Sequence, residues 1–149
     1  MRYILDTNIV VLYLREGVLA DFIDDTFNPL DEANEAILSV VSKGELKSLA
    51  KKNDWGNKRL GKLEAICEEL LIADINSEDI IERYAEIDAF SQGRLIGKPS
   101  TFSARNMGKN DLWIAATASI IAATLLTTDR DFEHLDGIFL NLEYIKMSK

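Results

Sequence analysis

Short, uninterrupted apolar runs that alternate with segments of helical spacing constrain the fold of this chain most strongly. The expected strands are residues 3–5, 36–41, 70–75 and 124–128, with a last one within residues 139–145. Runs without polar alternation are typical of strands buried on both faces, and strands that alternate with helices favour parallel pairing. The pattern therefore predicts an α/β fold, a three-layer α/β/α sandwich with a short, mainly parallel sheet.

The segments between the expected strands carry apolar residues at helical spacing. Helices are expected over residues 9–14, from 19 to the break at 28–29, from 43 to a bend at 53, and over 58–70, 77–90 and 111–121. Gly17 is expected to end the first helix in a left-handed conformation, and Ser42 to precede the helix that starts at Lys43. Residues 93–109 hold three glycines and a proline without a sustained period, which predicts a loop beside the working face.

The length of 149 residues fits a single domain, residues 1–149, that buries roughly 70% of its unfolded surface. The longest apolar stretch, residues 112–126, is too short and too polar to span a membrane. No secretory signal is expected, because the first residues reach Asp6 at once. A single cysteine, Cys67, cannot form an internal disulfide, so we expect a cytoplasmic protein.

The net charge of −8 argues, by itself, against a nucleic-acid partner. The distribution of charge along the chain points the other way. Residues 43–62 hold seven basic side chains against two acidic ones, and residues 94–109 hold four basic side chains and no acid. A positive track on an acidic body is one interpretation, and ordinary solvated helix faces are the other.

Four carboxylates fall where an open parallel sheet places its ligands, beyond the carboxyl ends of the strands. Asp6 and Asp129 directly follow expected strands, and Glu45 lies in the expected first turn of the next helix. Asp111 begins the Ala-rich helix that leads back to the strand before Asp129. We therefore expect these four side chains to share one rim of the sheet.

Each acid also has a purely structural explanation. Ser42 and Glu45 fit a capping box, Asp111 would be favourable near a helix N-terminus, and aspartates are common in turns. Four carboxylates on one rim would nevertheless repel each other unless a cation lay between them. An all-oxygen set selects Mg²⁺ or Mn²⁺, and His134 and Cys67, each the sole residue of its type, do not make a zinc set. Such a cation could activate water against a phosphodiester.

Four segments together resemble the PIN-domain family, and within it the VapC-type toxins of toxin–antitoxin pairs. The matching pieces are residues 3–8, with Asp6-Thr7-Asn8; 39–46, ending in Glu45-Leu46; 110–118, opening with Asn110-Asp111-Leu112-Trp113; and 125–132, with Thr127-Thr128-Asp129-Arg130-Asp131-Phe132. They occur in the family's order over nearly the whole chain.

The resemblance implies a metal-dependent endoribonuclease. Asp6, Glu45, Asp111 and Asp129 match the family's acidic positions, which act in catalysis and hold Mg²⁺ or Mn²⁺. Asn8 would support the first acid, and Asp131 would either assist Asp129 or cap the following turn. The family also implies a cognate antitoxin protein and a homodimer.

The candidates for phosphate contacts with RNA are basic residues that neighbour the acids in sequence: Lys43, Lys47, Arg105, Lys109 and Arg130. Three alternatives remain open. Another Mg²⁺-dependent α/β phosphohydrolase also places an aspartate after its first strand, although the haloacid-dehalogenase type needs a second aspartate where this chain has Asn8. A receiver domain needs an aspartate where the second and third strands end in Ser42 and Ile75. The third alternative is a non-catalytic or housekeeping PIN-like module that binds or processes RNA.

Overall fold

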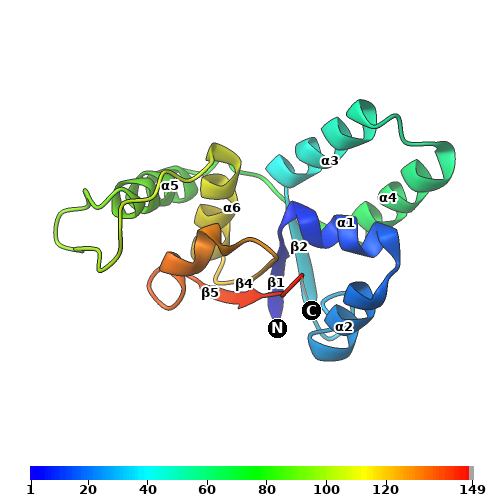
Figure 1. Cartoon of the computed structure of the whole chain (residues 1–149), viewed down its shortest axis with the longest axis horizontal. Helices are drawn as coiled ribbons and strands as arrows, with labels where there is room; N and C mark the ends of the chain where they lie inside the picture. Colours follow the sequence, from blue (N-terminus) through cyan, green and yellow to red (C-terminus); the bar gives the residue numbers. More distant parts are fainter. Residues whose placement is uncertain (148–149) are drawn as a thin grey trace.

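The computed structural model describes residues 1–147, and within them a parallel sheet forms the centre of the molecule (Figure 1). The strand order is β3-β2-β1-β4-β5, and every neighbouring pair is parallel. The strands are β1 (Arg2–Leu5), β2 (Glu35–Ser39), β3 (Leu71–Ala73), β4 (Thr124–Thr127) and β5 (Asn141–Tyr144). The predicted α/β fold with a short parallel sheet is confirmed.

Helices cover both faces of this sheet, as Figure 1 shows. The helices are α1 (Thr7–Arg15), α2 (Val18–Thr26), α3 (Val40–Lys52), α4 (Asn57–Glu69), α5 (Glu78–Ser91), α6 (Lys109–Ile120) and the 3₁₀ helix η1 (Arg130–Leu135). Helices α5, α6 and η1 pack on one face, whereas α1 to α4 contribute to the other. Among residues 1–147, no helix has the length and apolar character that a membrane crossing needs.

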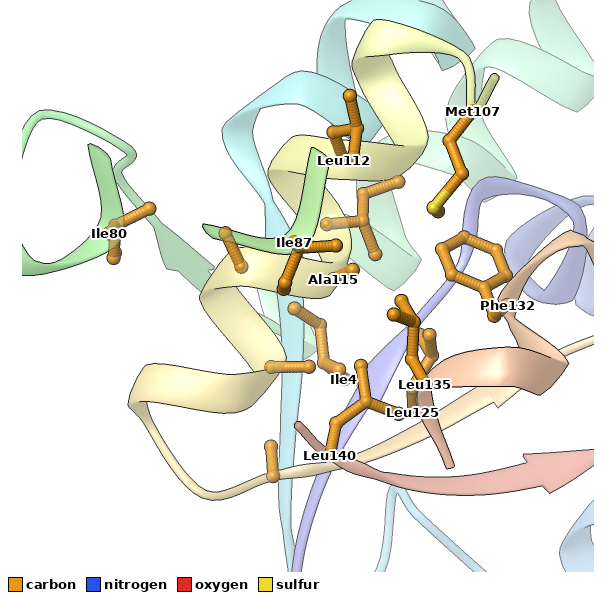
Figure 2. Close-up of a cluster of buried hydrophobic side chains, with 14 of the residues drawn as sticks. Ile4, Ile80, Ile87, Met107, Leu112, Ala115, Leu125, Phe132, Leu135 and Leu140 are labelled. Carbon is orange, nitrogen blue, oxygen red and sulfur yellow. The ribbon is translucent and has the colours of Figure 1, made fainter. Parts of the chain in front are cut away.

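The two faces have separate apolar cores because successive strand residues point to opposite sides. Ile4 of β1 packs with α5, α6 and η1, while its neighbour Leu5 packs with the opposite helices. Figure 2 shows the first of these cores, in which Leu135 of η1 lies beside Leu125 of β4, and Leu112 of α6 belongs to the same buried cluster. These buried contacts fix α6 and η1 on the sheet, and with them the acidic residues that they carry.

The parallel register aligns the carboxyl ends of the central strands. Leu5 pairs with Leu126, and Ile4 pairs with Ile37, so β1, β2 and β4 end along the same edge. Each of these strands is followed within a few residues by the start of α1, α3 or η1. The edge therefore gathers three strand ends and three helix starts.

Two local expectations are wrong. Helix α3 begins at Val40, not at Lys43, because the buried hydroxyl of Ser39 accepts a hydrogen bond from the Val41 N–H at 3.1 Å and caps the helix there. The left-handed residue after α1 is Glu16, with φ of 52°, whereas Gly17 is extended and precedes α2. Helix η1 was not expected at all. The irregular segment between α5 and α6 is confirmed.

Candidate functional site: an acidic cleft at the carboxyl edge of the sheet

A cleft of about 740 Å³ opens at the edge where β1, β2 and β4 end. Its lining residues are Asp6, Thr7, Asn8, Val40, Val41, Gly44, Glu45, Ser48, Leu49, Lys52, Asn110, Asp111 and Asp129. The four acids chosen from the sequence therefore line one cleft, although they come from four different segments of the chain.

Asp6 is the most buried of these acids, with 5% of its surface exposed. Its carboxylate caps α1 through an acceptor bond from the Thr7 N–H at 2.8 Å, and its other oxygen accepts from the Thr127 hydroxyl at 2.7 Å. Burial raises the pKa of Asp6 above its ordinary value, and the nearby charges of Glu45 and Asp129 act in the same direction. The two hydrogen bonds oppose this shift, because they stabilise the ionised form.

Glu45 faces the same cleft from the second turn of α3. The Thr7 hydroxyl donates a hydrogen bond to its carboxylate at 2.7 Å, which ties α3 to the start of α1. Because the helix is capped by Ser39 and not by Ser42, Glu45 is too far along α3 to form a capping box. The structural explanation for this acid is therefore wrong.

Asp111 lies in the first turn of α6, across the cleft from α3. Its pKa is raised to about 7, first by loss of solvent and then by the charges of Asp6, Asp129, Glu45 and Asp131. The carboxylates are thus close enough to repel one another. At neutral pH this cluster favours either a bound proton or a bound cation.

Asp129 and Asp131 complete the acidic cluster from η1. The Asp129 carboxylate accepts a hydrogen bond from the Asp131 N–H at 2.9 Å, as expected for an aspartate in a turn. Asp129 also lines the cleft. Oxygen atoms of Asp111, Asp129 and Asp131 lie within 4.8 Å of one another, as a shared cation would require. Asn8 also lines the cleft, and its amide donates to the Thr128 hydroxyl at 3.4 Å.

Two threonines, Thr7 and Thr127, organise these acids. The fully buried Thr127 hydroxyl donates to Asp6 and accepts from the Asp129 N–H at 3.0 Å, so one side chain connects both strand-end aspartates. The Thr7 hydroxyl likewise donates a hydrogen bond to the Glu45 carboxylate. The signal in the sequence is that each threonine lies within two residues of a candidate acid and inside one of the four segments that resemble the family.

The five basic candidates for phosphate contacts lie outside the lining of the acidic cleft. Lys43 and Lys47 line a separate groove between α3 and α4. The Arg105 guanidinium donates to the Arg130 carbonyl at 3.3 Å, while Arg130 itself pairs with Glu133 at 2.7 Å. Lys109 is the first residue of α6. Their contacts with RNA stay predictions.

The chemistry of the donor set fits a hard divalent cation. All its charged oxygen donors are carboxylates, and among residues 1–147 no histidine or cysteine lines the cleft. Mg²⁺ and Mn²⁺ prefer oxygen ligands and retain several waters, which an open cleft accommodates. Burial, and then the charges of neighbouring carboxylates, raise the pKa of Asp6 and of Asp111, and a bound cation would oppose both effects.

An open parallel sheet with acids converging on its carboxyl edge defines an α/β protein with a candidate cation site. More specifically, this chain belongs to the PIN-domain family, whose model matches residues 3–138. PIN domains are generally nucleases. A search among curated proteins finds no match.

Solved structures with the same fold include several toxin–antitoxin proteins. One is VapBC2 from Rickettsia felis bound to a promoter DNA fragment, at 24% identity and a TM-score of 0.69, covering 97% of this chain and 98% of that one. DNA-bound VapBC from Salmonella typhimurium gives 20% identity and a TM-score of 0.73 over 98% and 99%. VapBC-5 from Mycobacterium tuberculosis has 24% sequence identity and a TM-score of 0.60, and the match covers 98% of each chain. Identities this low establish likeness of fold.

Proposed function

We propose that this chain is a divalent-cation-dependent endoribonuclease and the toxin of a toxin–antitoxin pair in the cytoplasm. The observation that carries the proposal is the convergence of Asp6, Glu45, Asp111 and Asp129 in one cleft. Membership of the PIN-domain family and the likeness in fold to toxin–antitoxin proteins support it.

In this proposal the four acids hold Mg²⁺ or Mn²⁺, with Asp131 as a further oxygen donor beside Asp111 and Asp129. The bound cation supplies an activated water and offsets the charge that develops on the phosphate oxygens. The protein supplies fixed geometry. Thr127 orients Asp6 and the Asp129 backbone, Thr7 orients Glu45, and Asn8 supports the rim through Thr128.

The test is cleavage of single-stranded RNA by the purified protein in Mn²⁺, in Mg²⁺ and in EDTA, with the new ends mapped. We expect cleavage that requires the cation and that falls by about 100-fold or more in Asp6→Asn and Asp111→Asn, because each removes part of several kcal/mol of charge stabilisation. The exposed Asp79→Asn on α5 is the matched control and should cut at the wild-type rate.

Two results would contradict the proposal. Equal rates for wild type, Asp6→Asn and Asp111→Asn would leave only a binding role for the acids. An absence of new RNA ends in both cations would exclude the nuclease on the substrates offered and leave the non-catalytic alternative.

The partners proposed with this function are a basic antitoxin protein and a second copy of the chain. An arginine or lysine of the antitoxin could enter the cleft and stand in for the charge of the cation. Co-purification of the protein encoded next door, with loss of cleavage on its addition, tests the first partner. The mass in solution by light scattering tests the homodimer, and a monomer at micromolar concentration would contradict it.

A further inference from the structure

The acidic cleft continues along α3, away from the edge of the sheet. Val40, Gly44, Ser48 and Lys52 line it at intervals of four residues, so each is a neighbour of the next along the helix and the row advances by about 40° at each step. Glu45 and Lys52 are seven residues apart, which places them about 20° apart around the helix and about 10 Å apart along its axis. As Figure 1 shows, α3 leads from the end of β2 toward the turn before α4.

The charge of the cleft changes sign along this path. Every charged lining residue near the sheet edge is an acid, and in the part of the chain that the structure describes Lys52 is the sole basic side chain lining the cleft. Lys52 is exposed, and among residues 1–147 it has no ion-pair partner. A substrate with a phosphate at each end of this path would meet the acids at one end and an ammonium group at the other.

Gly44 keeps the wall of the cleft open between these two ends. A glycine inside a helix weakens it relative to alanine, so a packing reason is expected. None is present, because a Cβ at Gly44 would meet no atom within 4 Å. Since Gly44 lines the cleft beside Glu45, the space that a side chain would occupy there is open cleft.

We propose that α3 forms one wall of an extended substrate site, in which Lys52 binds an RNA phosphate one or more nucleotides from the bond that is cut. This inference rests on the proposed function and specifies its substrate as a single strand long enough to reach from Asp6 and Asp129 to the end of α3. Lys52 acts as a point charge on the backbone and reads no base.

The adjacent Lys51 provides a matched control. It has the same residue type, the same exposure and the same place in the last turn of α3, but it lines the groove toward α4. Any general effect of charge at the C-terminal end of the helix should appear at both lysines. An effect seen for Lys52 and absent for Lys51 indicates that the lysine side chain in the cleft contacts the substrate.

The experiment compares Lys51→Glu and Lys52→Glu on two RNAs that share one cleavage site, a long single strand and the same strand trimmed to a few nucleotides. For Lys52→Glu we expect the ratio of kcat/KM on long over trimmed RNA to fall about fivefold, the effect of one exposed charge pair. The slope of log KM against log salt on the long strand should decrease by about 0.7, for one lost phosphate contact. Lys51→Glu should keep the wild-type ratio and slope.

Gly44→Ala gives a second test, in which Tm and KM are expected to rise together. A misfolded variant would instead have a lower Tm. Alanine should stabilise α3 and raise Tm by about 2 °C, because its methyl group meets no protein atom. The same methyl group narrows the cleft and should raise KM on the long strand severalfold. Unchanged KM in the stabilised variant would show that the ligand does not approach this face of α3.

Failure of the inference is distinct from failure of the proposed function. Equal long-to-trimmed ratios for the two lysine variants, with wild-type cleavage intact, would overturn the role of Lys52 and leave the nuclease. If the wild-type protein cleaves neither RNA, the nuclease fails, and the variants are then compared by fluorescence anisotropy with the long RNA. Equal affinities of Lys51→Glu and Lys52→Glu would then overturn the inference as well.

Discussion

Replacement of Thr127 by valine isolates the connection between the two strand-end aspartates. Valine keeps the shape of the side chain but removes the hydroxyl that donates to Asp6 at 2.7 Å and accepts from the Asp129 N–H at 3.0 Å. Thr127 is fully buried and Asp6 is 5% exposed, so the carboxylate that loses this donor stays largely shielded from water. A hydrogen bond to a charged group contributes about 1.5–3 kcal/mol, and for a chain of this size we expect Tm to fall by roughly 3–12 °C.

The pH dependence of this loss identifies its cause. The Thr127 hydroxyl lowers the pKa of Asp6, so its removal raises that pKa further and costs more when Asp6 is ionised. The difference in Tm between Thr127→Val and wild type, measured by thermal unfolding in EDTA, should therefore be larger at pH 8 than at pH 5. Thr127→Ser keeps the hydroxyl and should retain most of the stability at pH 8.

Thr124 lies at the other end of β4 and is the matched control. It is buried, and its hydroxyl makes no hydrogen bond among the contacts of residues 1–147. Thr124→Val should therefore leave Tm nearly unchanged at both pH values. If Thr127→Val costs no more than Thr124→Val, or costs the same at pH 5 and pH 8, the hydroxyl does not support the ionised Asp6 and the reasoning is refuted.

Two further predictions concern titration of the folded protein. The pKa of Asp111 is about 7 in the fold, above its ordinary value of 3.8, so in EDTA its contribution to stability is lost as the pH rises from about 4 through about 7. Mg²⁺ should raise Tm at pH 8, where this stability is lost, and have little effect on Tm at pH 5. In EDTA at pH 8, Asp111→Asn should have a higher Tm than wild type. A lower Tm would contradict repulsion between Asp111 and the other carboxylates. Burial, and then the charge of Arg105, lower the pKa of His134 from 6.5 to about 4, so its contribution is lost as the pH falls from about 6.5 through about 4. His134→Gln should flatten the acid side of the Tm profile, and an unchanged profile would exclude His134 as the cause.

The central strands and the acids that follow them could be predicted because their signals are local. The apolar runs before Asp6 and Asp129 mark buried parallel strands, and the sheet rule then places their carboxyl ends together. The start of α3 could not be predicted in this way. In sequence Ser42 is the better cap, because Glu45 follows it at capping-box spacing, whereas in the fold Ser39 ends β2 beside Ala73 of β3 and caps α3.

Closeness in sequence to an acid, which selects Lys43 and Lys47 as candidates for phosphate contacts, is a poor guide on a helix. Lys43 and Lys47 are each two residues from Glu45, and two residues correspond to about 200° around an α-helix. They therefore face the groove toward α4, while Lys52, seven residues away, returns to the face of Glu45. Helical periodicity counted from Glu45 would have found Lys52 once the start of α3 was known.

The bond between Thr127 and Asp6 joins residues 121 positions apart in the chain. During synthesis the ribosome must complete β4 before this bond can form. The hydrogen bond from the Asp131 N–H to the Asp129 carboxylate can form only after that. A nascent chain that has emerged as far as α5 holds Asp6 and Glu45 but neither the strand nor the acids that complete the cleft. The acidic cleft, and with it the activity proposed for it, therefore cannot assemble on the ribosome before β4 and the residues that follow it have been made.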